Sequence, residues 1–175
     1  EITKENMMLT SELIKVTKLF DQNHIKYISF KGPTLSQAYY GNITLRQYCD
    51  LDILVKYIDI KKIIVLLEKI GYKGDYLYSK DKNSNYLKVI TFVNEKLATI
   101  IEIHCELISS SYAIDFRNIN FFNKIKTIDI NNNSLNILKK EILFIYLCIH
   151  GSKHVFERVS WICDINKLLL DKTIN

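Results

Sequence analysis

The sequence lacks several features that would assign it at once to a class of protein. No run of about 18 apolar residues indicates a membrane span. The net charge of +5 at pH 7 is mild for 175 residues and mixed in sign along the chain, so no basic tail argues for nucleic acid. The H-E-x-x-H pattern of zinc proteases is also missing, because Gly151 stands where its glutamate would be.

The number and spacing of the cysteines argue against a disulfide framework and against a zinc site. The chain has four cysteines and no C-x-x-C pair, and all four lie in apolar segments: Cys49, Cys105, Cys148 and Cys163. This usage fits reduced, buried thiols better than a disulfide framework or a zinc site. We therefore expect a cytoplasmic protein, and no signal peptide is visible, although the chain begins at Glu1.

The composition is that of a soluble globular protein. Hydrophobic residues make up 48% of the chain and charged residues 25%, and 175 residues suffice for one well-cored domain. One of the apolar segments expected to be a buried strand contains two acidic residues.

That strand is the segment 49–55, in which Asp50 and Asp52 interrupt an apolar run. Residues two apart on a strand share a face, so the two carboxylates point the same way while Leu51 and Ile53 point into a core. An Asp-x-Asp pair can also cap a turn or lie on a solvated face. A buried pair of like charges, however, needs a cation, and Mg²⁺ held by carboxylates and substrate phosphates would supply it.

A strand-turn-helix unit precedes this pair. Apolar residues spaced by three and four predict an amphipathic helix over 1–23, and a strand is expected over 24–32. Pro33 suits the first turn of a following helix over 34–40. Lys31 and Gly32 then lie at a strand end just before a helix N-terminus, a position that favours phosphate.

A second such unit follows. Arg46 lies in a loop over 41–47, where its side chain either faces Asp50 and Asp52 or is a solvated charge. A helix is expected over 57–70, ending at Gly71. The Tyr-rich segment 72–84 is expected to be an excursion or turn.

Two strands, over 86–93 and 98–108, are then expected to form a hairpin. Period two places Glu102, His104 and Glu106 on one face of the second strand. If this strand pairs beside 49–55, Glu102 becomes the third carboxylate of a site for two metal ions. The alternative is a strand whose polar face is wet.

The rest of the chain is expected to be mostly helical. A mixed segment over 116–133 precedes an apolar helix over 135–149, with Ser134 as its N-cap. On a continuing helix, His150, His154 and Arg158 would form one stripe with Lys153 beside it. For Trp161 and Asp164, packing and a helix-face salt bridge are the expected roles. A last helix over 159–172 stops almost at the terminus, as it would in a fragment of a longer protein.

The order of these motifs resembles the uncharacterised nucleotidyltransferase-like family of the DNA polymerase β superfamily. The resemblance covers most of the chain and rests on one ordered set: Lys31-Gly32, Arg46, Asp50-x-Asp52, Glu102-x-His104, His150-Gly151-x-x-His154 and Trp161-x-x-Asp164. It implies an α+β (mixed α/β) fold, with a small mixed sheet flanked by helices. We expect a nucleotidyltransferase-like core over 1–125 and a helical C-terminal segment over 126–175.

The resemblance also implies a reaction. A nucleoside monophosphate would pass from an NTP to a hydroxyl of an unknown small-molecule acceptor, with Mg²⁺ or Mn²⁺ as cofactor. Asp50, Asp52 and Glu102 would be the catalytic residues and metal ligands. The expected nucleotide-binding residues are Lys31, Gly32, Arg46, His150, Lys153 and His154.

One departure bears on this expectation. The Gly-Ser that usually holds the triphosphate in the superfamily is Lys31-Gly32-Pro33-Thr34 here, so the Lys31 ammonium would take over the phosphate contact. Two alternatives remain open. One is a toxin-like transferase acting on tRNA or a protein, although nucleic acid is not favoured by the charge; the other is a non-catalytic nucleotide- or partner-binding module.

Overall fold

The computed structural model describes residues 1–75, 89–108 and 119–171. Within these ranges the strands form one mixed seven-stranded sheet in the order β3-β4-β5-β2-β1-β7-β6. The strands are β1 (Tyr27–Ser29), β2 (Leu51–Val55), β3 (Lys73–Asp75), β4 (Val89–Asn94), β5 (Thr99–His104), β6 (Ile125–Ile130) and β7 (Asn133–Leu138). The helices are α1 (Ile2–Gln22), α2 (Gly32–Leu35), η1 (Ser36–Tyr40), η2 (Tyr57–Asp59), α3 (Ile60–Lys69), η3 (Phe121–Asn123), α4 (Lys140–Lys153) and α5 (Val159–Leu170). The expected α+β fold, a small mixed sheet flanked by helices, is confirmed.

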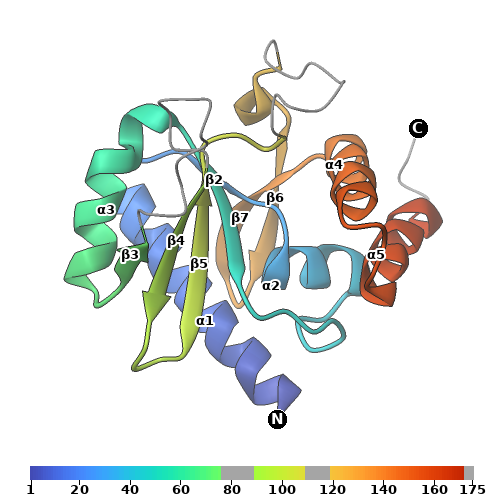
Figure 1. Cartoon of the computed structure of the whole chain (residues 1–175), viewed down its shortest axis with the longest axis horizontal. Helices are drawn as coiled ribbons and strands as arrows, with labels where there is room; N and C mark the ends of the chain where they lie inside the picture. Colours follow the sequence, from blue (N-terminus) through green and yellow to red (C-terminus); the bar gives the residue numbers. More distant parts are fainter. Residues whose placement is uncertain (76–88, 109–118, 172–175) are drawn as a thin grey trace.

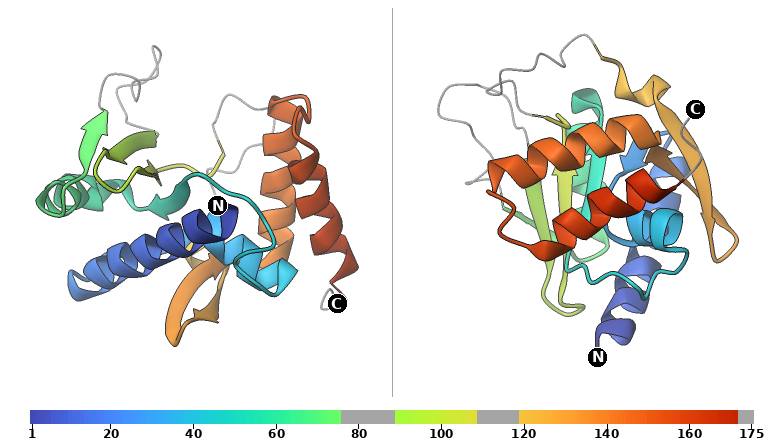
Figure 2. Two further views of the ribbon diagram at one scale, coloured as in Figure 1. Left: turned by 90° about the horizontal axis from the view of Figure 1, so that it is seen from below. Right: turned by 90° about the vertical axis from the view of Figure 1, so that its right-hand side faces the viewer.

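Two apolar clusters cover the two faces of this sheet. One contains buried side chains of α1 and α3, among them Leu13 and Ile63, packed on Ile53 of β2. The other contains Leu54 of β2 and Leu147 of α4. Since neighbouring residues of a strand point to opposite faces, β2 contributes to both clusters and is buried along its whole length. Figures 1 and 2 show α1 and α3 on one side of the sheet and α4 and α5 on the other.

The register between β2 and β5 places the site. The two strands are parallel, and Asp52 pairs with Glu102 while Leu54 pairs with His104. The expected hairpin of β4 and β5 is confirmed, although β5 is shorter than the expected strand over 98–108. Part of the expected excursion, Lys73–Asp75, is a strand that pairs with β4, and residues 76–88 lie outside the described residues.

The expected helix over 135–149 is wrong at its beginning. Residues 125–138 form the hairpin of β6 and β7, and β7 pairs in parallel with β1 through Ser29 and Ile137. Ser134 therefore lies in a strand and caps no helix. The segment 126–175 is thus helical only from Lys140 onward. Residues 134–137 alternate polar and apolar side chains, a short strand pattern that the neighbouring apolar run of α4 obscures in the sequence.

The expected stripe from His150 to Arg158 does not lie on one helix. α4 ends at Lys153 with His154 as its C-cap, and the chain turns back through Val155 and Phe156, whose φ angles are +53° and +49°. The turn depends on Gly151, because a Cβ there would lie 2.1 Å from a ring carbon of Phe156. α5 then runs back beside α4 (Figure 2).

Candidate active site

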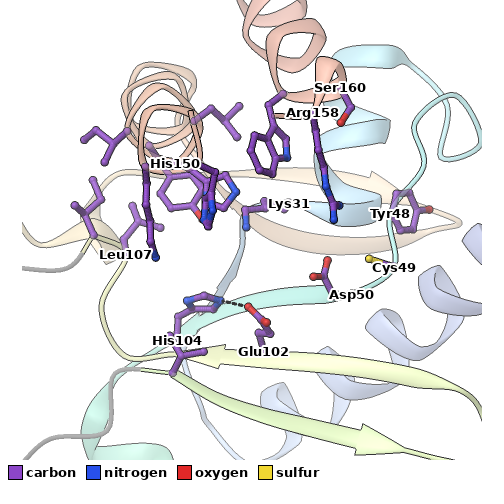
Figure 3. A pocket seen from close by; sticks show the side chains of 18 of the residues that line it. Lys31, Tyr48, Cys49, Asp50, Glu102, His104, Leu107, His150, Arg158 and Ser160 are labelled. Atoms are coloured by element: carbon purple, nitrogen blue, oxygen red, sulfur yellow. Dashed lines mark ion pairs between the residues drawn. The ribbon is translucent and has the colours of Figure 1, made fainter. Parts of the chain in front are cut away.

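The site is a pocket of about 650 Å³ between the sheet and the helices α4 and α5. Asp50, Glu102 and His104 lie on its sheet side, and His150 and Arg158 lie on its helical side, as Figure 3 shows. A cavity of this size is ordinary for a drug-sized ligand. The pocket also contains Lys31, Arg46, Lys153 and His154, so every residue expected from the sequence to bind nucleotide lines it except Gly32.

Asp52 is the most deeply buried charge on the sheet side, at 1% exposure. Its Oδ1 accepts hydrogen bonds from Lys31 Nζ and His104 Nε2, each at 3.1 Å. Burial works to raise the pKa of Asp52, but the Lys31 ammonium and His104 outweigh it and hold this pKa well below its usual range. Asp52 therefore stays ionised inside the protein.

Glu102 and His104 complete a group of possible metal ligands. Asp52, Glu102 and His104 each offer one ligand atom, and these atoms lie within 4.8 Å of one another. Asp52 Oδ2 is buried and has no hydrogen-bond partner. A buried oxygen without a partner is costly, so this donor set fits a divalent cation, which would engage it.

Asp50 lies just before β2, and its carboxylate faces the pocket in Figure 3. Burial, together with the nearby Asp52 charge, raises the pKa of Asp50 to about 6 against the opposing charge of Lys31. Asp50 belongs to the sheet side of the pocket but not to the close ligand group of Asp52, Glu102 and His104.

Lys31 leaves β1 and reaches over the site. Its Nζ lies 5.5 Å from the ring centroid of Tyr146, and its side chain is only 15% exposed. Burial works to lower the pKa of Lys31, but Asp52 and Tyr146 together outweigh it, and the net pKa lies above the usual range. The Lys31 ammonium therefore stays protonated at neutral pH and can pair with a phosphate.

Gly32 shapes the backbone at this point. Its φ is +57°, and a Cβ would lie 3.2 Å from the carbonyl oxygen of Asp50. The hydroxyl of Thr34 donates a hydrogen bond to the carbonyl of Lys31 at 2.8 Å, which closes the turn. Gly32 thus brings β1 close to the Asp50 backbone.

Arg46 lines the pocket but its guanidinium is already engaged. Nε contacts Asp164 Oδ1 at 2.8 Å, and a second guanidinium nitrogen contacts Oδ2 at 2.9 Å. Tyr40 donates its hydroxyl to the same carboxylate at 2.7 Å. The salt bridge expected for Asp164 on a helix face instead ties α5 to the loop before β2.

Aromatic rings and a cation form the helical side of the pocket. The His150 ring stacks on Tyr146 at 5.8 Å and meets Trp161 edge-on at 5.0 Å, and the Arg158 guanidinium lies 5.8 Å from the Trp161 ring centroid. Burial lowers the pKa of His150 to about 3, and the neighbouring Lys31 charge adds to this effect. His150 is therefore a neutral ring at neutral pH, and Trp161 packs on it as expected.

The sequence reasoning assigned no role to His104. The sequence does predict that His104 shares a strand face with Glu102, because it lies two residues later. Its distance to Asp52 could not be predicted, since that distance depends on the register of two strands far apart in sequence.

The expected buried state of the cysteines is wrong for two of them. All four cysteines are free, and Cys49 and Cys163 are exposed while Cys105 and Cys148 are partly buried. Among the described residues, no helix is long and apolar enough to cross a membrane.

Comparisons with known proteins give one family match and several matches to solved structures. A family model described as uncharacterised nucleotidyltransferase matches residues 1–175. A search of curated proteins found no significant match.

Several solved structures share the fold. The lincosamide antibiotic adenylyltransferase LnuA, bound to lincomycin, superposes with a TM-score of 0.64 at 18% identity, covering 91% of this chain and 96% of its own. The ANT(2'')-Ia complex with adenylyl-2''-tobramycin gives 0.63 at 10% identity, with 90% and 86% covered. An antigenic nucleotidyltransferase-like protein from Paracoccidioides brasiliensis gives 0.59 at 12% identity, with 92% and 75% covered.

Proposed function

Because the chain belongs to the uncharacterised nucleotidyltransferase family, we propose that it transfers a nucleoside monophosphate from an NTP to a hydroxyl of a small molecule. The observation that carries the proposal is the pairing of Asp52 with Glu102 on adjacent parallel strands beneath the pocket. This pairing brings together two carboxylates that lie 50 positions apart in the chain.

The proposed role of each residue follows from its position in the pocket. Asp50, Asp52 and Glu102 would hold Mg²⁺ or Mn²⁺, which would neutralise triphosphate charge and stabilise the leaving pyrophosphate. Lys31 would pair with phosphate oxygens as a point charge, and Lys153 and His154 reach the pocket from the opposite side. His150, uncharged, stacked on Tyr146 and edge-on to Trp161, offers a ring surface for the base or the acceptor.

Arg46 has a different role in this proposal from the one the sequence indicated. Since Asp164 already engages its guanidinium on two sides, Arg46 would position the loop before Asp50 rather than bind phosphate directly. Gly32 would act through the backbone, by bringing Lys31 and Asp50 together.

The acceptor proposed here is a small molecule. LnuA is solved with lincomycin and ANT(2'')-Ia with adenylylated tobramycin, and this chain covers 96% and 86% of those chains. The four free thiols suit the cytoplasm, where NTPs are available.

Pyrophosphate release tests the proposal. The protein is incubated with each of the four NTPs, Mg²⁺ or Mn²⁺, and hydroxyl-bearing acceptors that include lincomycin and tobramycin. For any active combination, Asp52→Asn and Glu102→Gln should lower the rate at least about 100-fold, as expected for lost transition-state charge stabilisation.

Asp129→Asn is the matched control, because Asp129 is an exposed aspartate on β6, away from the pocket. Full activity in both site variants would overturn the proposal. Asp52→Asn also leaves Lys31 and His104 facing a neutral side chain, so its fold is checked by circular dichroism, and Glu102→Gln serves as the second variant.

A further inference from the structure

His104 lies between the two carboxylates that face each other across β2 and β5. Its Nε2 is 3.1 Å from Asp52 Oδ1 and 3.4 Å from Glu102 Oε2. Figure 3 shows the imidazole and the Glu102 carboxylate turned toward each other on the sheet side of the pocket. One nitrogen thus meets two oxygens from two different strands.

These separations match the spacing of neighbouring ligands on a metal ion. Two ligands held at right angles by bonds of about 2.1 Å lie about 3.0 Å apart. The distances of 3.1 and 3.4 Å from the His104 nitrogen to its two carboxylate oxygens are close to this value. A small shift of side chains would therefore suffice to bring all three onto one ion.

Two further observations point to a ligand at this place. Asp52 is 1% exposed, and its Oδ2 has no hydrogen-bond partner although Oδ1 has two. In addition, the His104 ring is held edge-on against Phe30, with ring centroids 5.1 Å apart. The imidazole is therefore oriented before any ion arrives, as ligating histidines usually are.

A charge-neutralising role for His104 is the competing explanation. An imidazole that only balances two carboxylates would be pushed aside when a divalent ion enters. The structure favours a ligand, because the edge-on packing against Phe30 supports the ring in the orientation that points Nε2 toward the carboxylates.

We propose that His104 Nε2 gives up to solvent the proton that it shares with Asp52 and becomes a ligand of the metal held by Asp52 and Glu102, and that the site prefers a first-row transition-metal ion to Mg²⁺. Mg²⁺ favours an all-oxygen set and binds imidazole poorly, whereas Mn²⁺ and the later transition metals accept mixed nitrogen and oxygen ligands. The inference rests on the proposed function only for the presence of a metal at this site.

Pulsed electron paramagnetic resonance on Mn²⁺ tests the inference without any turnover. Mn²⁺ is added to the full chain alone, and in a second sample together with inorganic triphosphate, which contains no nitrogen. The expected result is a modulation of the Mn²⁺ spin echo by directly bound ¹⁴N, which changes to the ¹⁵N pattern in protein labelled with ¹⁵N-histidine.

Substitutions assign the nitrogen. His104→Gln should remove the modulation and lower the preference for Mn²⁺ over Mg²⁺ at least about tenfold in competition titrations, since lost ligand support commonly costs that much affinity. His150→Gln, on the opposite side of the pocket, is the matched control and should keep the modulation. The ¹⁵N labelling needs no substitution, so the test survives if His104→Gln fails to fold.

The outcomes separate the two proposals. Tight Mn²⁺ binding without nitrogen modulation overturns the ligand role of His104 and leaves the proposed transferase intact. Modulation that persists in His104→Gln also overturns it. If Mn²⁺ binds neither alone nor with triphosphate, the metal of the proposed function is refuted as well.

Discussion

The ion pair of Arg46 and Asp164 gives a stability prediction that can be worked through from the structure. Asp164 is fully buried, the Arg46 side chain is 9% exposed, and two guanidinium nitrogens contact the two carboxylate oxygens. Asp164→Asn keeps the size of the side chain but removes its charge, which leaves a buried guanidinium facing a neutral amide. Removing one partner of a buried ion pair typically costs 3–5 kcal/mol, so we expect unfolding free energy to fall by about 3 kcal/mol.

Tyr40 limits the loss. Its hydroxyl donates to Asp164 Oδ1 and can still donate to the amide oxygen of an asparagine, so the lower end of the range is expected. For a domain of this length, about 3 kcal/mol corresponds to a fall in Tm of roughly 6–12 °C. Urea denaturation followed by tryptophan fluorescence measures the change, because Trp161 lies on the same helix as Asp164.

A double substitution sharpens this test. Arg46→Met with Asp164→Leu removes both charges and should be less destabilising than Asp164→Asn alone, since no buried charge is left without a partner. Asp129→Asn, at an exposed position of β6, is the matched control and should stay within about 0.5 kcal/mol of the wild type. A loss below about 1 kcal/mol for Asp164→Asn would refute the reasoning.

Three further perturbations have defined outcomes. The pKa of His150 is lowered to about 3 from an ordinary 6.5, so below pH 6.5 the unfolded chain takes up a proton at this residue while the folded chain does not. The unfolding free energy therefore falls as the pH drops from 6.5 toward 3. His150→Gln should reduce this fall in acid titrations. Gly151→Ala should destabilise the protein by about 1–3 kcal/mol in urea titrations, because its Cβ would displace the Phe156 ring. Lys31→Met should destabilise the protein in EDTA by leaving Asp52 buried without its cation, and added Mn²⁺ should recover part of the lost Tm.

Each of these has a result that would contradict it. An unchanged acid dependence in His150→Gln would mean that this ring does not stay neutral in the fold. A Gly151→Ala protein as stable as the wild type would show that the Phe156 ring moves freely. If Mn²⁺ stabilises the wild type but not Lys31→Met, then Lys31 supports metal binding instead of substituting for the ion's charge. For Lys31→Met, Lys61→Met at an exposed position of α3 is the matched surface control.

The fold was largely accessible from the sequence because its central elements are strongly patterned. The apolar run around Asp50 and Asp52 indicated a strand buried on at least one face, and β2 is buried along its whole length. The helix over 57–70 had clear helical spacing. The hairpin over 125–138 was missed because it borders an apolar helix, and a short alternating strand is hard to separate from such a run.

For the site, too, local patterns in the sequence were informative and long-range side-chain contacts were not. Asp52 and Glu102 were predicted as site residues because each interrupts an apolar strand, and the pairing of their strands that this prediction required is confirmed. The engagement of Arg46 by Asp164 was missed because it joins residues 118 positions apart through side chains alone. No local pattern reports such a contact.

The turn after α4 shows a third limit. His150, Lys153, His154 and Arg158 were expected on one helix, and they do line one pocket. They reach it through a helix end and a turn with left-handed residues at Val155 and Phe156. Neither is a residue type that signals this backbone conformation.

Thermal stability with metal and nucleotide together tests the central claim most directly. The wild type, Asp52→Asn and Asp129→Asn are melted with each of the four NTPs, with and without Mg²⁺ or Mn²⁺. A ligand at 100 times its dissociation constant stabilises by about 2.7 kcal/mol, so the wild type and Asp129→Asn should show a clear rise in Tm that needs both metal and NTP. Asp52→Asn should lose this rise. If no NTP raises the Tm of the wild type with either metal, or if Asp52→Asn keeps the full rise, the pocket is not a metal-nucleotide site and the account is wrong.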